Sequence, residues 1–395
     1  MLGRSIYKAQ VTAWGDDFIK HFIAVTLCFC FITTLFSGCG KFFAADSSST
    51  PAEPAGGEAT NKPIVEYDYN PLTGMDKTED YPVGQRPVAI MVNNLREALP
   101  QSGICDADLI YEMVTEAGIT RMMAVYTDYT KVPNVGPVRS ARDQFVQFMI
   151  PLNAIYVHIG SSIYADNMLN YYNYQNIDGM KLGTTAFYFD EARYRQPKAS
   201  EHCWYTNAEK IVSGVQKVME MSQDFSDRGG FDPVFNFYSQ SEPNYFPDGG
   251  EAVKIAFRFS DYGDALFEYT GSGNYVKSEY DAPQMDENTS TQLEFKNIFL
   301  LMTDITLKAD GYCTEFDLTQ GTGYYFSLGK FEPITWKKGS PLDSLKVYKQ
   351  DGTELRVNAG KSYIGVIDYD MAGTVAITGA APEQPVEQPV EQPTA

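Results

Sequence analysis

The sequence contains few residues of the kinds that bind metal ions or build disulfide frameworks. It has six cysteines and three histidines in 395 residues, and no two cysteines form a CxxC pair. Neither His158 nor His202 has a second metal ligand at a useful spacing. We therefore expect no metal site and no cofactor, and at most one disulfide among Cys105, Cys203 and Cys313.

The chain also lacks an excess of basic residues. It carries 51 acidic against 31 basic side chains, which gives a formal net charge of -20. Nucleic acid is therefore not expected as a main partner, because binding through phosphates needs a broad basic face. The 44% of hydrophobic residues suffices for buried cores, and the length allows two ordinary domains.

An apolar run long enough for an easy membrane span is missing as well. The run FIAVTLCFCFITTLF at 22–36 has fifteen residues, follows basic residues and ends at SGCG. This order is typical of an export signal with a bacterial lipobox. We predict a lipoprotein signal peptide at 1–39, lipidation of Cys39 and a protein held on the outer face of the cell membrane. The alternative, an uncleaved membrane anchor, leaves the rest of the chain outside too.

Two segments have the composition of chains that bury almost nothing. Residues 40–63 are rich in Ser, Pro, Ala, Gly and Glu, which predicts a flexible tether. Residues 379–395 repeat Pro-Val-Glu-Gln, which predicts a disordered, partly extended tail.

Residues 64–221 mix the periodicities of strands and helices. Helical patterns occupy 141–149 and 208–221. Apolar runs of strand length, bounded by Pro, Gly or Asn, occupy 86–94, 108–116, 121–129 and 153–160. We predict an α+β fold whose N-terminal domain is α/β-like with a mixed sheet.

The pattern changes after a stretch dense in Gly, Pro, Ser and Asp at 222–250, which we interpret as an interdomain linker. From 251 to 378 the apolar residues recur with a period of two, as in VKIAFRFS at 253–260. Asp351-Gly352 between two such runs indicates a hairpin. We predict a mostly antiparallel β C-terminal domain over 251–378.

Arginine is unevenly distributed. Five of the eleven arginines fall within 57 residues, and the only lysine in that window is Lys131. A guanidinium is favoured over an ammonium where a planar fork meets a carboxylate or phosphate in two parallel hydrogen bonds. The bias indicates an anion site built from Arg86, Arg96, Arg121, Arg139 and Arg142.

The stretch VGPVRSARDQF at 135–145 offers a way to build such a site. Ser140 and Asp143 have the spacing of a capping box, so a helix is expected to begin here. Arg139 precedes this helix and Arg142 lies in its first turn, which lets both side chains reach its N-terminus. The alternative is that each arginine pairs with a nearby acid, among them Asp143, Asp108, Glu112 and Glu116.

Two glutamates in YEMVTEAGITRMMAVY at 111–126 are candidates for acid chemistry. Glu112 and Glu116 share a face of a strand but lie roughly 13 Å apart, which is too far for a retaining glycosidase pair. A single raised-pKa carboxylic acid remains possible, as in lytic transglycosylases, and Glu116 is the candidate. The alternative is that Glu116 pairs with Arg121. His158, at the carboxyl end of an expected strand, is a further candidate site residue, although a structural histidine is the more frequent case.

At these motifs the chain resembles the YerB family of Gram-positive lipoproteins. The resemblance rests on NPLTG (70–74), RPVAIMVNN, ADLIYEMVTEAGITRMMAVY, VGPVRSARDQF and VHIGSS, and then on GTGYYF, ITWKK and DGTELRVNAGKSYIGVID. It implies an N-terminal family domain and a separate C-terminal β domain, but it supplies no activity. The residues that stand at family motif positions are Arg121, Arg139, Ser140, Arg142, Asp143 and His158.

These patterns lead to one main functional hypothesis and two alternatives. The main hypothesis is a lipid-anchored envelope protein that binds an anionic cell-wall component, either peptidoglycan or a phosphate-bearing glycan or precursor, through the arginines. The first alternative is a wall-cleaving glycosidase or lytic transglycosylase that uses Glu116 as its acid. The second is a protein-protein adaptor for wall synthases that works through its β domain.

Overall fold

The computed structural model describes residues 62–379 apart from Pro197 and Pro247. The predicted signal peptide with Cys39, almost all of the tether and almost all of the tail lie outside these residues. Within the described range, no helix has the length and apolar character needed to cross a membrane.

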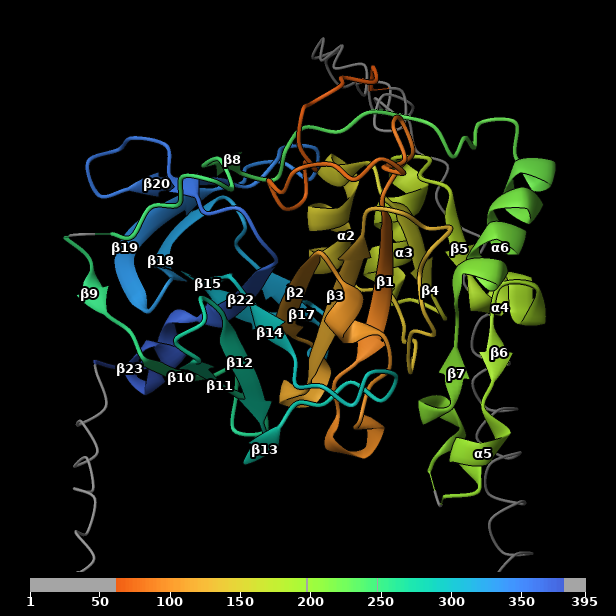
Figure 1. Cartoon of the computed structure of the whole chain (residues 1–395). Helices are drawn as coiled ribbons and strands as arrows, with labels where there is room; N and C mark the ends of the chain where they lie inside the picture. The colour runs from red at the N-terminus through yellow and green to blue at the C-terminus, as the bar shows by residue number, and fades with distance from the viewer. Residues whose placement is uncertain (1–61, 197, 247, 380–395) are drawn as a thin grey trace, which may run out of the picture. The chain divides into compact units, whose positions relative to one another are not determined.

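The main sheet draws its strands from both halves of the sequence (Figure 1). Strands β15 (Asn297–Thr303) and β22 (Ser362–Asp368) pair in parallel, and β22 pairs in parallel with β2 (Leu109–Val114). Strands from either side of residues 222–250 therefore meet in the middle of the sheet. The strand order is β20 (Lys346–Lys349), β19 (Lys330–Lys337), β18 (Gln320–Ser327), β15 (Asn297–Thr303), β22 (Ser362–Asp368), β2 (Leu109–Val114), β3 (Thr120–Tyr126), β1 (Val88–Asn93), β4 (Ile155–His158) and β5 (Asn176–Asp178), with β9 (Gly250–Glu251) beside β19.

Strands β1, β2, β4, β5, β15 and β22 of this sheet run in the same direction. Their C-terminal ends therefore lie along one edge of the sheet, which we call the carboxyl edge, and their N-terminal ends lie along the opposite amino edge. In such sheets ligands bind outside the carboxyl ends of the strands. The carboxyl edge includes Asn93, Val114 and His158.

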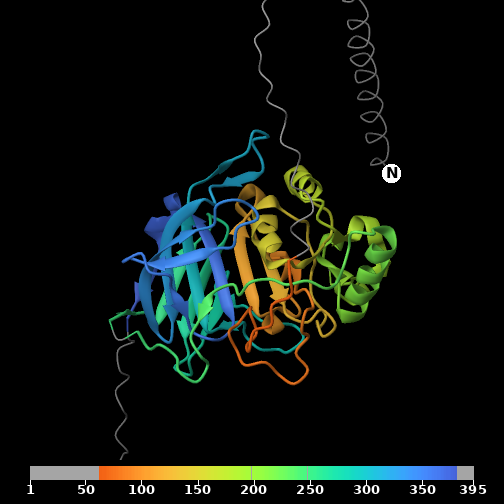
Figure 2. The same cartoon turned by 90° about the horizontal axis from the view of Figure 1, so that it is seen from above.

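Each face of the main sheet packs against its own layer, because successive side chains of a strand point to opposite faces. Ala89 and Met91 of β1 join a core that includes α2 (Asp143–Met149) and α3 (Ile163–Tyr171). Val88, Ile90 and Val92 join a second core with α6 (Ala208–Met221) and the second sheet. In Figures 1 and 2 the orange N-terminal strands lie between the blue C-terminal strands and the green α6.

The second sheet packs on the α6 side of the main sheet. Its order is β13 (Ala282–Pro283), β12 (Tyr275–Glu279), β11 (Asp264–Tyr269), β10 (Lys254–Arg258) and β23 (Ala376–Thr378), with β14 (Glu294–Phe295) beside β12. Three two-stranded pairs are β16 (Ile305–Leu307) with β17 (Thr314–Phe316), β8 (Asn236–Phe237) with β21 (Arg356–Val357), and β6 (Tyr188–Phe189) with β7 (Trp204–Tyr205).

The described helices are short and belong to the N-terminal half. They are α2 (Asp143–Met149), α3 (Ile163–Tyr171), α4 (Gly179–Leu182), α5 (Glu191–Tyr194) and α6 (Ala208–Met221). In α6 the buried residues Ile211, Val215 and Val218 recur every three or four positions, so one stripe of the helix faces the second core.

The predicted fold class is confirmed: a mixed sheet with helices precedes a part made mostly of antiparallel strands. The structure adds that these two parts share the main sheet. The domain boundaries at 64–221 and 251–378 stay a prediction. The expected hairpin is present at Asp351-Gly352, where Tyr348 and Glu354 form an antiparallel bridge.

Candidate functional site

The segment Pro137–Ala141 lies at the carboxyl edge between β1 and β4. Strand β1 pairs directly with β4 at Val88–Ile90. Beyond that point the backbone of the segment lies between the two strands and hydrogen-bonds to β1 and to the residue that follows β4. The Arg139 N–H donates to the Met91 carbonyl at 2.9 Å, and the Arg139 carbonyl accepts from the Ile159 N–H at 3.1 Å. The backbone therefore fixes Arg139 at the point where two parallel strands separate.

Arg142 forms a two-point ion pair with Glu116. Its Nε donates to Glu116 Oε1, and its Nη2 donates to Oε2 at 2.9 Å. Glu116 follows β2 in a 3-10 turn and is almost completely buried. This arrangement is the forked geometry that favours arginine over lysine.

Arg121 and Arg139 approach the same place. Arg121, the second residue of β3, has Nη2 3.7 Å from Glu116 Oε2, and its Nη1 donates to the Ser140 carbonyl at 2.9 Å. Arg139 Nη1 lies 3.6 Å from Oε1 of the exposed Glu201. Within the described chain, the buried Nε atoms of Arg121 and Arg139 have no hydrogen-bond acceptor. We call Arg121, Arg139 and Arg142 with Glu116 the arginine cluster.

A hairpin from the C-terminal half completes the surroundings of the arginine cluster. Lys308, just after β16, pairs with Asp143 at 2.9 Å and also with Glu315. The Cys313 thiol lies 3.8 Å from Glu116 Oε1. Sequence reasoning missed both residues, because nothing in their local pattern relates them to a site about 170 positions earlier in the chain.

Among the buried and half-buried side chains of the arginine cluster and the Lys308–Asp143 pair, positive charge exceeds negative charge. Three guanidinium groups and the Lys308 ammonium face two buried carboxylates, Glu116 and Asp143, while the remaining acids, Glu201 and Glu315, are more than half exposed. Burial lowers the pKa of Arg121, and the charges of Arg142 and Arg139 lower it further. The cationic state of Arg121 is therefore costly until a further anion approaches.

Two of the five arginines lie elsewhere, so the sequence-based grouping was too broad. Arg86 is buried and donates to the carbonyls of Asn153, Ser226 and Ala154 and to the hydroxyl of Tyr174. Arg96 is exposed and lies over the ring of Tyr280. Spacing along the chain did not separate these structural arginines from the clustered ones.

The expected capping box is not formed. Helix α2 begins at Asp143, its N-cap residue is Arg142, and no side chain caps it. Asp143 pairs with Lys308 instead. Ser140 contributes its carbonyl to Arg121, and its hydroxyl lies at the carboxyl edge near Gly160.

His158 is buried at the end of β4 beside the arginine cluster. Its Nδ1 lies 2.8 Å from the Gly160 carbonyl, and its Nε2 lies 3.1 Å from Asn176 Oδ1. Burial lowers its pKa. These contacts hold the turn that precedes α3, which is a positioning role.

The environment of Glu116 does not favour the general-acid role considered above. Burial opposes its ionisation, but the hydrogen bonds and charge of Arg142, with the charge of Arg121, outweigh burial and lower its pKa. A general acid needs the opposite shift, so that the carboxyl group still holds a proton near neutral pH.

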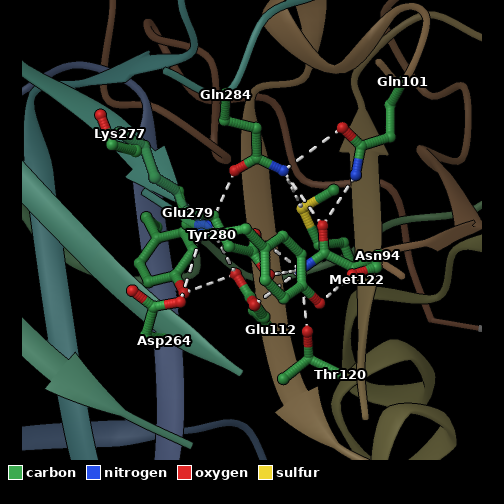
Figure 3. A network of polar contacts seen from close by, with 12 residues as sticks. Asn94, Gln101, Glu112, Thr120, Met122, Asp264, Lys277, Glu279, Tyr280 and Gln284 are labelled. Carbon is green, nitrogen blue, oxygen red and sulfur yellow. Dashed lines mark hydrogen bonds and ion pairs between the residues drawn. The ribbon is translucent and has the colours of Figure 1, made fainter. Parts of the chain in front are cut away.

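A second charged group lies deep between the two sheets (Figure 3). Lys277 of β12 donates to Glu279 Oε2 at 2.9 Å and to Gln284 Oε1 at 2.7 Å, and it lies 3.1 Å from Glu112 Oε2. The carboxylates of Glu112 and Glu279 both accept from the Asn94 side-chain amide. We call Glu112, Lys277 and Glu279 the buried triad.

The buried triad is closed to solvent and its hydrogen bonding is complete. All three side chains have 0% exposure. Each of the three ammonium hydrogens has an acceptor, and no polar atom of these residues lacks a partner among the described residues. Burial raises the pKa of Glu279, and the neighbouring Glu112 charge raises it further. The triad joins strand β2 of the main sheet to β12 of the second sheet.

Candidate metal ligands and the cysteines lie apart from one another among the described residues. Its residues contain no group of three or more His, Cys, Asp or Glu side chains placed to hold a metal ion. Cys105, Cys203 and Cys313 are free thiols.

Comparisons with known proteins identify the family. Residues 72–221 match the N-terminal domain, and residues 253–364 the C-terminal domain, of the DUF3048 proteins of unknown function. The chain belongs to this family. It is 28% identical over 312 residues to a Bacillus subtilis protein named "Putative lipoprotein YerB", a match that covers 76% of this chain and 87% of the relative.

A solved structure is similar as well. The crystal structure of the YerB protein from Bacillus subtilis matches with a TM-score of 0.66 and 25% sequence identity. The match covers 78% of this chain and 99% of the other. The two-part architecture described above is therefore a property that this chain shares with YerB.

Proposed function

We propose that this protein is a lipid-anchored protein of the cell envelope that binds an anionic cell-wall component at the arginine cluster. The lipobox-like SGCG around Cys39 and the lipoprotein name of its relative support the anchor. The ligand class is a wall polymer or precursor that bears phosphate or carboxylate groups. The outer face of the membrane is the location at which such a ligand is found.

The observation that carries this proposal is the incomplete pairing of buried positive charge at the carboxyl edge. Arg121 and Arg142 share the buried Glu116, Arg139 pairs with the exposed Glu201, and Arg121 and Arg139 each retain a buried Nε without an acceptor among the described residues. Buried polar groups are nearly always hydrogen-bonded, so such groups mark a place for a ligand or water. An oxyanion supplies the negative charge that is missing.

The three arginines differ in their access to a ligand. The side chains of Arg139 and Arg142 are 20% and 13% exposed, whereas that of Arg121 is only 3% exposed. The ligand therefore contacts the outer edges of Arg139 and Arg142, and Arg121 acts through its charge. Glu201, which holds Arg139 at 3.6 Å, is displaced when the ligand binds.

Sedimentation with purified Gram-positive cell walls tests the proposal. Walls that keep their phosphodiester polymers should retain the full-length protein more strongly than walls stripped of these polymers. Arg139→Gln should weaken retention by about tenfold, because it removes a charge-assisted hydrogen bond worth about 1.4 kcal/mol. Higher salt should weaken retention by the native protein.

Arg96→Gln is the matched control for Arg139→Gln. Arg96 lies in the same arginine-rich part of the sequence but stacks on Tyr280, outside the cluster. Retention of the control variant should equal that of the native protein. Equal retention of the Arg139→Gln variant and the native protein would overturn the proposal.

A further inference from the structure

A cavity of about 830 Å³ lies at the amino edge of the main sheet, the edge opposite to the arginine cluster. Asp106, Lys296 and Lys361 line it, and they precede β2, β15 and β22 respectively. Cavities of roughly 300 to 1,000 Å³ are typical of small-ligand sites in proteins. The cavity is therefore large enough for a disaccharide.

The lining of this cavity is suited to hydrogen bonding. It contains no aromatic ring, so a bound molecule is recognised through polar groups rather than by stacking. Most of the polar lining residues carry a hydroxyl or an amide, and both groups donate and accept hydrogen bonds. These residues are Ser239, Gln240, Asn274, Thr289, Thr291 and Gln292.

Two half-buried lysines give the cavity its charge. The Lys361 ammonium donates to the Cys105 carbonyl and has no ion pair within residues 62–379 as described. The Lys296 ammonium has neither a hydrogen bond nor an ion pair in that range, and burial alone lowers its pKa. The lining acids, Asp106 and Glu294, are exposed. Among the lining residues the half-buried charges are thus positive, and the negative charges face solvent. Behind the lining, the buried Asp286 accepts from the Cys105 N–H, and Asp108 lies near Lys361.

Two glycines make room for the Lys296 side chain. Gly360 has φ +144°, and a Cβ at this position would lie 2.5 Å from Lys296 Cβ. A Cβ at Gly273, which has φ +108°, would lie 2.9 Å from Lys296 Nζ. A Cβ at Gly360 would therefore clash with the stem of Lys296, so this glycine leaves room for the lysine side chain.

We propose that this cavity is a second binding site, which takes a carboxylate-bearing amino sugar. Lys296 binds the carboxylate, Lys361 adds charge, and the hydroxyl and amide groups bind the sugar hydroxyls and acetamido groups. The inference deepens the proposed function, because it gives a wall-binding protein a site for the glycan itself. It does not depend on the arginine cluster, which lies at the other edge of the sheet.

The test uses two disaccharides that differ by one carboxylate. Calorimetric titration of the full-length protein compares N-acetylglucosaminyl-N-acetylmuramic acid with N,N'-diacetylchitobiose, which lacks the lactyl carboxylate. We expect the charged disaccharide to bind about tenfold more tightly, as expected for a hydrogen bond between charged groups. Lys296→Gln should abolish this difference and leave the binding of diacetylchitobiose unchanged.

Controls separate this inference from misfolding and from the first proposal. Lys254→Gln replaces an exposed, paired lysine outside the cavity and should keep the tenfold preference. The Arg139→Gln variant should also keep the tenfold preference, although its retention on phosphate-bearing walls should fall. Lys296→Gln should unfold at the same denaturant concentration as the native protein, since the removed ammonium had no partner in the described chain.

Cysteine protection provides an independent measurement. Cys105 lines the cavity and is partly exposed, whereas Cys203 and Cys313 are buried. The charged disaccharide should slow alkylation of Cys105, as followed by peptide mapping. Equal affinity for the two disaccharides, no binding of either, or binding only of a wall peptide that carries no sugar would each refute the inference.

Discussion

The buried triad and the arginine cluster both gather charged side chains in the interior, but they differ in completeness. In the triad every ammonium hydrogen has an acceptor and exposure is 0%. In the arginine cluster Glu116 pairs with Arg121 and Arg142, whereas Arg139 pairs with the exposed Glu201. The buried Nε atoms of Arg121 and Arg139 have no acceptor among the described residues, and the side chains of Arg139 and Arg142 reach solvent. A closed, satisfied network fixes the fold, whereas an open and incomplete one is free to bind. Chemical similarity alone does not separate structural from functional charges.

Lys277→Met should have the largest effect on stability. It leaves the carboxylates of Glu112 and Glu279 buried without their cation, and such a loss costs about 3–5 kcal/mol. Chemical denaturation measures the free energy of unfolding. Lys254→Met, on the exposed face of β10, should change it by less than about 0.5 kcal/mol. Equal effects of the two variants would contradict the structural role of the triad.

Glu116→Gln should destabilise the protein by about 3 kcal/mol, because it leaves Arg121 and Arg142 without their shared carboxylate. Sulfate should partly restore the stability of the Glu116→Gln variant, at concentrations that leave the stability of the Lys277→Met variant unchanged. Thermal unfolding of both variants with and without sulfate measures the difference. Equal responses to sulfate would show that the cluster binds no anion.

The pH dependence of the free energy of unfolding should reveal the raised pKa of Glu279 in the buried triad. Glu279 has a raised pKa in the folded protein, so the folded state keeps a proton that the unfolded state releases above the ordinary value of 4.5. The contribution of Glu279 to the free energy of unfolding is therefore fully present at low pH and is lost as the pH rises toward the pKa of the folded state. The native protein should lose about 1 kcal/mol between pH 6 and pH 7, and Glu279→Gln should remove this slope.

Arg139→Gln should have the smallest effect on stability. Among the described residues the side chain pairs only with the exposed Glu201, and such pairs contribute about 0–1 kcal/mol. The free energy of unfolding should fall by less than about 0.5 kcal/mol, even though retention on walls drops. A large loss of stability would assign Arg139 to the fold, like Arg86.

The sequence predicted the parts of the fold that depend on local patterns. The strands around 86–94 and 153–160 and the helix at 208–221 were located by periodicity, and Asp351-Gly352 by turn chemistry. The pairing of β22 with β2 joins residues about 250 positions apart, and nothing in either strand specifies its neighbour. The shared sheet was therefore beyond prediction from local patterns.

The residues of the candidate site were also predictable only in part from the sequence. The arginine bias indicated Arg121, Arg139 and Arg142, and the pairing of Glu116 with Arg121 was one of the alternatives considered. The bias did not exclude Arg86, whose partners are backbone carbonyls from distant loops. Lys277 gave no signal either, since a lysine at an inward position of a strand is recognised only once Glu112 is seen across from it.

A crystal of the full-length protein soaked in phosphate would show whether the arginine cluster holds an anion. We expect a tetrahedral anion about 2.8 Å from guanidinium nitrogens of both Arg139 and Arg142, with Glu201 turned away. An arginine cluster without bound phosphate, with Arg139 still paired with Glu201, would mean that the cluster is not an anion site.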